Sequence, residues 1–380
     1  MDINDIDNYY SLLKSFIVDN LFLYIILYFI IVKTENKLLM VLYIILAIII
    51  HIVIKLLFRM YTNLGSTLRS SECLNIMNRL SVNKINKSIS FADEETLNRP
   101  LKDFIINSSH NTYIACNQNA DVASLDAIKS TLALGARFIE LDVYPNNNMG
   151  TEPNDMIPIV AHGAKRDPNR NIFTTNKLLF EDCLDVIAQY GFMVDDPLFL
   201  YIENNTRNHI QTQEMMAKLI KNKLGDKLPS ITTANGEKMT LTISNEHNFN
   251  TFDAVIFNYP IKNLLGKIII IMNNPQGMMK EMVSIIPNIN RDTFRMYFRD
   301  NTDITNFKKD NEYTTQVVRI YPKGNLMGHF SYNYDPTPLW NKGFQFVSLN
   351  FTNYDSNLKK NLEKFKEYNM ILKPTSKMDI

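Results

Sequence analysis

Apolar residues dominate the start of the chain, in two long segments that a short polar loop separates. Residues 38–54 are apolar except for His51, and residues 16–32 form a run of nearly the same length that contains Asp19. A helix rises about 1.5 Å per residue, so about 20 such residues span a hydrocarbon core of ~30 Å. Two buried core helices are the alternative, but helices that are apolar on every face need a larger protein around them than this segment supplies. The pattern predicts one or two transmembrane helices, most simply a hairpin, over residues 1–58.

The charges around these segments predict an orientation. The N-terminus is acidic where a signal peptide would be basic, and no small-residue cleavage site follows. Four basic residues follow the second apolar segment: Lys55, Arg59, Arg69 and Arg79. The positive-inside rule then places the rest of the chain in the cytoplasm. We therefore expect an integral membrane protein whose large domain faces the cytoplasm.

After the apolar segments, short β-branched runs alternate with helical patterns. Residues 59–98 are polar and predict a linker with one short helix near residues 68–82. Beyond them, strands are predicted at residues 104–106, 137–143, 158–161, 198–202, 267–272, 316–321, 344–349 and 370–372. Helices are predicted between several of these strands, at residues 124–134, 180–190 and 211–224. This alternation indicates an α/β fold, with a closed parallel (β/α)8 barrel as the first choice and a doubly wound sheet as the alternative.

The composition excludes several classes of protein but does not identify the function. The chain has 380 residues, of which 46% are hydrophobic, and a net charge of +1. These values exclude a disordered chain and a coiled coil, and they give no basic footprint for nucleic acid. Three scattered cysteines are too few for a disulfide framework or a thiolate zinc site, which favours a reducing compartment. No glycine-rich phosphate loop is present in the sequence, so nucleotide cofactors are disfavoured.

Polar residues interrupt the apolar strands at one predicted edge. Six of them end four consecutive predicted strands: His110, Asn111, Glu140, Asp142, His162 and Glu203. In a barrel, the carboxyl ends of neighbouring strands converge on one mouth, where such folds place their chemistry. Carboxylate and amide oxygens suit calcium or magnesium better than zinc, and two histidines beside the ion could donate to a phosphoryl oxygen and to a leaving group. Each residue alone is explained as simply by an ion pair, a cap or a turn, but six together predict an active site.

Several segments carry motifs of a known family. Four lie in the first half of the predicted α/β fold: RPLKDFIINSSHNTYIACNQ (99–118), GARFIELDVY (135–144), VAHG (160–163) and LFLYIENN (198–205). Three lie in the second half: VVRIYPKGN (317–325), SYNYDPTPLWNKGFQFVSLNF (331–351) and NMILKP (369–374). The first four resemble the X half of eukaryotic-type phosphoinositide-specific phospholipase C, and the last three resemble its Y half and the end of its barrel. The resemblance implies a distorted TIM barrel with three parts: an X half over residues 99–274, a short linker over 275–313 and a Y half over 314–380.

The resemblance also implies an activity. The chain would be a membrane-anchored, Ca²⁺-dependent phosphodiesterase that cleaves phosphatidylinositol, or its phosphates, to diacylglycerol and inositol phosphate through a cyclic intermediate. On the matching positions, four residues would hold Ca²⁺: Asn111, Glu140, Asp142 and Glu203. The implied partners are a membrane phosphoinositide substrate and the lipid bilayer, with no nucleic acid and no evident protein partner.

The remaining roles are implied in the same way. His110 would stabilise the phosphoryl transition state, and His162 would protonate the diacylglycerol oxygen. Glu140 or Glu203 would take the proton of the attacking inositol hydroxyl. Two residues of the Y half, Arg319 and Tyr321, would clasp and stack on the inositol ring.

One departure leaves the substrate open. Members of the family commonly carry lysines that bind ring phosphates just after the strand at 267–272, whereas this chain has Asn273 and Asn274. A neutral amide does not replace a cation on a phosphate, so unphosphorylated phosphatidylinositol or a monophosphate is as plausible as the bisphosphate. Two other functions stay open: a phosphoinositide-binding scaffold without turnover, and a glycerophosphodiester phosphodiesterase.

Overall fold

The structure is a computed structural model of the whole chain. It describes residues 23, 25–28, 30–82, 84, 86–116, 122–146, 157–163, 174, 176–206, 209–232, 236, 238–243, 256–287, 295–300, 316–323 and 331–374. For residues 54–67, 231, 232, 238, 295–300 and 316, the description is limited to the backbone. The chain divides into two compact units, Met1–Gly65 and Ser66–Ile380, and α2 (Lys37–Val82) contributes to both.

In the first unit, two helical segments are joined by a short turn. Residues 25–28 and 30–33 are helical, and α2 begins after residues 34–36. The side chain of Asn36 accepts hydrogen bonds from the backbone N–H groups of Leu38 and Leu39, at 3.0 and 3.2 Å, which satisfies two otherwise unpaired donors at the helix start. Side chains of both segments line a cavity of about 280 Å³: Leu23, Ile26, Ile30, Tyr43, Leu46, Ala47, Ile50 and His51.

Within the described part of the chain, no helix offers a stretch both long enough and apolar enough to cross a membrane. This finding contradicts the predicted localisation as an integral membrane protein with a cytoplasmic barrel, and it leaves the predicted transmembrane hairpin without support. Residues 16–32, the first predicted span, lie mostly outside the described residues. Residues 38–54, the second, belong to one helix of 46 residues that continues through polar sequence to Val82. An apolar run determines what surface a helix presents, but it does not determine where the helix ends.

The second unit is built on a parallel sheet. Its strands follow the spatial order β8 (Ile268–Met272), β5 (Leu198–Asn204), β2 (Phe138–Pro145), β1 (Phe104–Ser109), β11 (Phe346–Leu349), β10 (Gln316–Tyr321) and β9 (Arg295–Asp300). Each neighbouring pair in this order is parallel. The predicted α/β class is therefore confirmed, and the carboxyl ends of these strands lie at one edge, as the sequence argument required.

Two predicted barrel strands run the other way. β3 (Pro158–Val160) pairs antiparallel with the end of β2, and β12 (Met370–Leu372) pairs antiparallel with β1. The short β4 (Leu178–Leu179) pairs antiparallel with β3. The prediction that β3 and β12 are parallel strands was therefore wrong, because a short apolar run does not encode strand direction. Conversely, β9 lies where the sequence predicted a linker, because its sequence RMYFRD is too polar to read as a buried strand.

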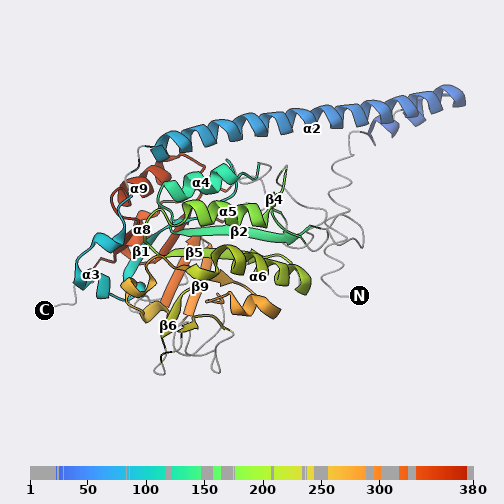
Figure 1. The fold of residues 1–380 in the computed structure, drawn as a ribbon. Helices are drawn as coiled ribbons and strands as arrows, with labels where there is room; N and C mark the ends of the chain where they lie inside the picture. The colour runs from blue at the N-terminus through green and yellow to red at the C-terminus, as the bar shows by residue number, and fades with distance from the viewer. Residues whose placement is uncertain are drawn as a thin grey trace. The chain divides into compact units, whose positions relative to one another are not determined.

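Five helices of the described chain lie between strands of the sheet. They are α4 (Leu125–Ala133), α5 (Phe180–Tyr190), α6 (Ile210–Leu224), α8 (Thr337–Asn341) and α9 (Ser356–Lys364). α4 packs against α5 and α5 against α6, and Figure 1 shows α4 and α5 side by side along β2. α4 ends as predicted before Gly135, whose φ of +89° is a conformation that L side chains rarely adopt.

Short elements complete the unit. A helical segment, α3 (Glu94–Asn98), and two 3-10 turns, η1 (Ile89–Phe91) and η2 (Leu101–Asp103), precede β1. The 3-10 turn η4 (Gly225–Lys227) follows α6, and β6 (Ser230–Thr232) and β7 (Lys238–Thr240) form a separate hairpin. Two further 3-10 turns, η6 (Ile261–Leu264) and η7 (Gly277–Glu281), flank β8.

Alternation along β2 separates the helix-facing core from the site. Ile139, Leu141 and Val143 belong to the core cluster that includes the inner faces of α4, α5 and α6. Phe138 belongs instead to the cluster on the other face of the sheet. Since side chains alternate along a strand, Glu140 lies on the same face as Phe138 and Asp142. The core thus fixes which face of β2 carries the carboxylates.

The last turns of α2 are anchored within the second unit. Met77 is buried in the helix-facing core, and the side chain of Asn78 accepts a 2.6 Å hydrogen bond from Ser130 of α4. A disulfide joins Cys73 to Cys116, with the two Cα atoms 5.6 Å apart. The small number of scattered cysteines predicted free thiols and a reducing compartment, and this disulfide, between cysteines 43 positions apart, stands against that expectation.

Candidate active site

Three carboxylates meet at the carboxyl ends of β2 and β5. In the parallel pair, Asp142 lies directly opposite Glu203, and Glu140 lies two positions earlier on β2. One oxygen from each of the three side chains lies within 4.8 Å of the other two. Glu140 and Asp142 are buried, and Glu203 is half-buried. Residues that the sequence predicted as metal ligands are therefore brought together by strand register.

The loop after β1 brings Asn111 to the same place. Its backbone N–H donates to Oε2 of Glu140 at 3.0 Å, and its φ of 42° lies in the left-handed region that asparagine tolerates best among residues with a side chain. Thr112 ties the loop to β2 twice, since its N–H donates to the Glu140 carbonyl and its hydroxyl accepts from the Glu140 N–H. The fourth predicted metal ligand thus sits on a fixed backbone beside the carboxylates.

Arg319 forms a buried ion pair with Glu140. Its Nη2 donates to Oε2 of Glu140, and its side chain and that of Glu140 are only 2% and 3% exposed. The guanidinium carbon lies 5.0 to 5.1 Å from the ring centroids of Phe138, Tyr201 and Tyr321. The structure places Arg319 against a carboxylate within an aromatic cage, and its predicted contact to the inositol ring stays a prediction.

Opposing effects set the protonation of this pair. Burial raises the pKa of Glu140, but the charges of Arg319 and His110 and the hydrogen bond from Asn111 lower it by more, so the pKa lies below its ordinary value. Burial lowers the pKa of Arg319, and Glu140 more than offsets this effect. Both groups are therefore charged. Burial, followed by the charge of Glu203, raises the pKa of Tyr201, so this neighbouring phenol stays neutral.

His110 is held from two sides. Its Nδ1 lies 2.8 Å from Oδ1 of Asn350, and its Nε2 lies 4.0 Å from Oε2 of Glu140. Its ring stacks on Tyr321, with centroids 5.9 Å apart and planes 11° apart. The side chain of His110 is 12% exposed. The predicted catalytic histidine therefore faces the carboxylates through Nε2.

His162 reaches the site by a different route from the one predicted. The sequence argument treated residues 158–161 as the next parallel strand, but β3 is antiparallel to β2 and returns the chain toward Asp142. The N–H of Ala161 donates to the Asp142 carbonyl at 3.3 Å. His162 follows, and its own N–H donates to the hydroxyl of Thr174 at 3.3 Å. The hairpin thus brings the residue before His162 next to the backbone of Asp142.

Comparison with known families adds the observation that decides the class. The model of phosphatidylinositol-specific phospholipase C, X domain, matches residues 97–248, and the model of its Y domain matches residues 273–376. The chain carries the X and Y domains of phosphatidylinositol-specific phospholipase C. The X domain supplies the three carboxylates and both histidines, and the Y domain supplies Arg319 and Tyr321. The predicted enzyme class, a phosphodiesterase of the phosphoinositide phospholipase C type, is confirmed at the level of these domains.

Curated relatives agree with the domain assignment. The 1-phosphatidylinositol 4,5-bisphosphate phosphodiesterase epsilon-1 of Caenorhabditis elegans is 33% identical over 139 residues, which are 36% of this chain and 6% of the relative. The delta-3-A phosphodiesterase of Danio rerio is 23% identical over 302 residues, 68% of this chain and 36% of the relative. The solved structure of S. officinalis PLC21 is 25% identical with a TM-score of 0.56, and the match covers 73% of this chain and 37% of that one. The chain therefore spans well under two thirds of the length of these relatives.

One residue of the site, Asn350, was not predicted from the sequence. It follows β11 directly, so the rule that found Glu203 at the end of β5 also applies to it. Asn273 and Asn274, the neutral residues noted in the sequence, form a rim with Asn204, the residue after Glu203. Asn204 donates from its backbone to the Asn273 side chain at 2.9 Å, and its amide donates to the carbonyls of Asn273 and Asn274 at 3.1 and 3.2 Å.

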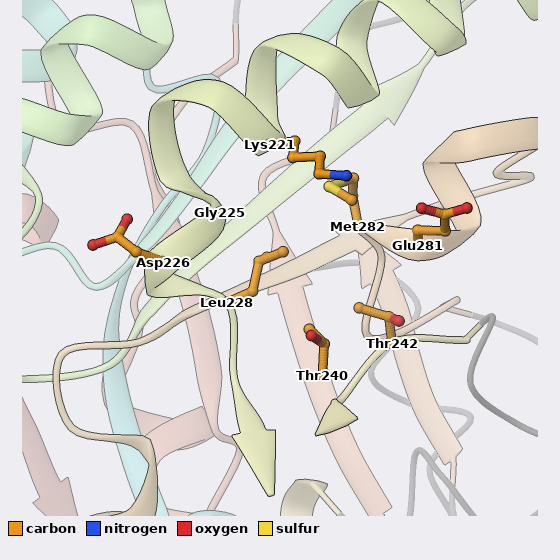
Figure 2. Close-up of a pocket in the computed structure, with 8 residues that line it drawn as sticks. All are labelled: Lys221, Gly225, Asp226, Leu228, Thr240, Thr242, Glu281 and Met282. Carbon is orange, nitrogen blue, oxygen red and sulfur yellow. The ribbon is translucent and has the colours of Figure 1, made fainter. Parts of the chain in front are cut away.

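A separate cavity of about 660 Å³ lies between the end of α6, β7 and η7 (Figure 2). It is lined by Lys221, Gly225, Asp226, Leu228, Thr240, Thr242, Glu281 and Met282. None of these lining residues belongs to the site at the ends of β2 and β5. Volume alone therefore does not identify the active site, which is marked by the convergence of charged groups instead.

Proposed function

We propose that this chain is a Ca²⁺-dependent phosphoinositide phospholipase C that cleaves phosphatidylinositol, or its phosphates, to diacylglycerol and inositol phosphate. The proposal rests on one observation above all, the convergence of three carboxylates at the strand ends of an X–Y domain pair, with Nε2 of His110 4.0 Å from one of them. The relatives are named as phosphodiesterases of phosphatidylinositol 4,5-bisphosphate, which supports the lipid class. A lipid at a membrane surface would be the substrate.

The donor set fits calcium. Three carboxylates with oxygens within 4.8 Å of one another, joined by the amide of Asn111, are hard oxygen ligands of the kind that Ca²⁺ takes in numbers of 6 to 8. Arg319 offsets one of the three negative charges, so the described charges still favour a cation. Asn111, Glu140, Asp142 and Glu203 would hold the ion. When bound, it would supply positive charge to a phosphoryl oxygen and lower the pKa of a nearby hydroxyl.

The two histidines would have different catalytic roles. His110 presents Nε2 toward the carboxylates, where its imidazolium form would donate a hydrogen bond to a phosphoryl oxygen as negative charge develops. His162 approaches from the β3 side and would protonate the diacylglycerol oxygen as it leaves. Glu140 or Glu203 would take the proton from the inositol 2-hydroxyl that attacks phosphorus. A cyclic phosphate forms first, and water then opens it.

The test is hydrolysis by the full chain of phosphatidylinositol, its 4-phosphate and its 4,5-bisphosphate in detergent micelles, with Ca²⁺ or with chelator. We expect release of inositol phosphates only with Ca²⁺, abolished by Glu203→Gln and His162→Ala. Glu363→Gln is the matched control, because Glu363 is an exposed carboxylate of α9 whose ion pair with Lys366 lies at the surface.

Two outcomes would contradict the proposal. No release from any of the three lipids by a folded chain would favour a lipid-binding scaffold, and lipid-binding measurements would then decide. Release of glycerol phosphate instead of inositol phosphates would assign the site to glycerophosphodiester hydrolysis.

A further inference from the structure

We propose that Asn350 is a positioning residue that fixes the tautomer and orientation of His110, and so determines that Nε2 is the ring nitrogen offered to the substrate. The inference rests on the proposed function only for its catalytic consequence. The claim that Asn350 orients the ring of His110 depends only on the contacts in the structure. None of the sequence motifs or the metal-site argument assigned a role to Asn350.

Strand register brings the two residues together. β1 and β11 are parallel neighbours in which Ser109 lies opposite Leu349, so the next residue of each strand, His110 and Asn350, meet across the pair. The backbone N–H of His110 donates to the Leu349 carbonyl at 2.9 Å. The side-chain contact, Nδ1 to Oδ1 at 2.8 Å, is therefore built on a fixed backbone rather than on a mobile loop.

The amide of Asn350 is held in one orientation. Its Nδ2 donates to the carbonyl of Ser331 at 2.8 Å and to the Ser331 hydroxyl at 3.3 Å, which turns Oδ1 toward His110. Its backbone N–H donates to Oδ1 of Asn333 at 2.7 Å, and Nδ2 of Asn333 donates to the Asn350 carbonyl at 3.1 Å. Asn350 is 1% exposed and Asn333 is 7% exposed. The buried amide cannot turn over without breaking this network.

The hydrogen-bond network around Asn350 extends to the start of α9. Nδ2 of Asn333 also lies within 3.3 Å of Oδ1 of Asp355. Asp355 is the N-cap of α9, and the same oxygen accepts from the N–H groups of Asn357 and Leu358 at 3.0 and 2.8 Å. The orientation of Asn350 is thus tied to a secondary-structure element and not to solvent.

The chemistry follows from the direction of these bonds. A carbonyl oxygen only accepts, so the ring nitrogen of His110 that faces Oδ1 must carry a proton, in both the neutral ring and the imidazolium. Nε2 is then the nitrogen whose proton can change, and it is the one 4.0 Å from Oε2 of Glu140. The stacked ring of Tyr321 holds the plane of the imidazole, so Asn350 and Tyr321 together leave Nε2 aimed at the site.

Three variants separate positioning from packing. Asn350→Leu keeps the size of the side chain but removes the acceptor. Asn350→Asp keeps an acceptor oxygen toward His110 but loses the donor to the Ser331 carbonyl. Asn361→Leu is the matched control, because Asn361 is a buried asparagine of α9 whose amide donates to Oδ1 of Asn107 at 2.8 Å. Each is measured for kcat and KM on a soluble short-chain phosphatidylinositol, with the melting temperature beside it.

We expect Asn350→Leu to lower kcat by about 10- to 100-fold with KM unchanged within about 2-fold, the usual scale for a residue that orients a reacting group. Asn350→Asp should recover part of that loss, because it keeps the acceptor but loses the bond to Ser331. Asn361→Leu should lower the melting temperature with kcat unchanged. A kcat for Asn350→Leu within about 2-fold of wild type would overturn the proposal. So would a loss of kcat in Asn361→Leu as large as that in Asn350→Leu, because lost packing would then explain both.

A second measurement needs no activity. Nitrogen NMR of the full chain labelled at its six histidines, assigned with His110→Gln, reads which ring nitrogen of His110 is protonated. The proposal requires a protonated Nδ1 in the wild type and its loss in Asn350→Leu. Protonation at Nε2 alone in the neutral ring would overturn the positioning claim. A wild type without turnover but with a protonated Nδ1 would instead count against the proposed function and leave the positioning claim standing.

Discussion

The buried ion pair between Glu140 and Arg319 provides the sharpest test of how the site is held together. Both side chains are at most 3% exposed, so neither charge can be solvated if its partner is removed. Replacing Arg319 by Met leaves the Glu140 carboxylate buried beside two other carboxylates. Breaking such a pair from one side costs about 3–5 kcal/mol, because an uncompensated buried charge remains. Glu140→Gln should cost a similar amount, because the buried guanidinium loses its carboxylate partner.

The double variant distinguishes pairing from packing. Glu140→Gln with Arg319→Met removes both charges, so its loss should fall short of the sum of the single losses by at least about 2 kcal/mol. Urea unfolding reports this directly through fluorescence, since the chain has one tryptophan, Trp340, and it is buried in the second unit. The titrations are run with chelator, so that metal binding does not contribute to stability. The exposed pair of Lys366 and Glu363 is the control, and Glu363→Gln should leave the unfolding midpoint unchanged.

The pH dependence has a defined sign. The folded-state pKa of Glu140 is lowered, so its stabilising contribution is present above the ordinary value of 4.5 and is lost as the pH falls through the folded value. In Arg319→Met, Glu140 loses the charge that most lowers its pKa, and burial then raises that pKa. The stability difference between wild type and this variant should therefore shrink as the pH falls from 7 toward 5. A coupling energy below about 0.5 kcal/mol, or a difference that grows on acidification, would refute the reasoning.

Three further changes have defined outcomes. Glu203→Gln should weaken Ca²⁺ binding by at least about 10-fold in calorimetry with the fold intact, since one carboxylate of the cluster is lost, and unchanged affinity would remove Glu203 from the ligand set. Asn273→Lys should shift relative hydrolysis rates toward lipids with ring phosphates, because it places a cation where the side chains are neutral. An unchanged order of rates would show that this position does not contact the lipid headgroup. Gly135→Ala should lower the unfolding free energy by well over 1 kcal/mol, because an added Cβ would lie 2.0 Å from Oδ1 of Asn369 at a positive φ. Gly266 also has a positive φ but faces open space, so Gly266→Ala should lower the unfolding free energy by less. Equal losses from the two variants would contradict the steric argument.

Much of the sheet could be predicted because its strands are buried. The runs at 104–106, 198–202 and 267–272 are apolar at nearly every position, and each became a parallel strand within a few residues. Strand direction could not be predicted in the same way. The three-residue strands β3 and β12 carry no periodicity that distinguishes an antiparallel addition from a barrel strand, and β9 is too polar to be recognised before its partner β10 is known.

The site could be predicted in part for the same reason. Glu140, Asp142 and Glu203 end buried strands, and the convergence of parallel strand ends brings them together. The partners that hold the site lie far away in sequence. Arg319 is 179 positions from Glu140, and Asn350 is 240 positions from His110. No local pattern predicts such pairs, because they arise only when the X and Y domains pack together.

Phosphorus NMR of phosphatidylinositol hydrolysis by the full chain tests the central claim most directly. If the carboxylates and histidines act as proposed, a cyclic inositol phosphate appears first and a monoester follows. Both signals depend on Ca²⁺ and are absent with His162→Ala. A folded chain that forms a monoester without any cyclic product, or that forms the same products with chelator present, would contradict the account.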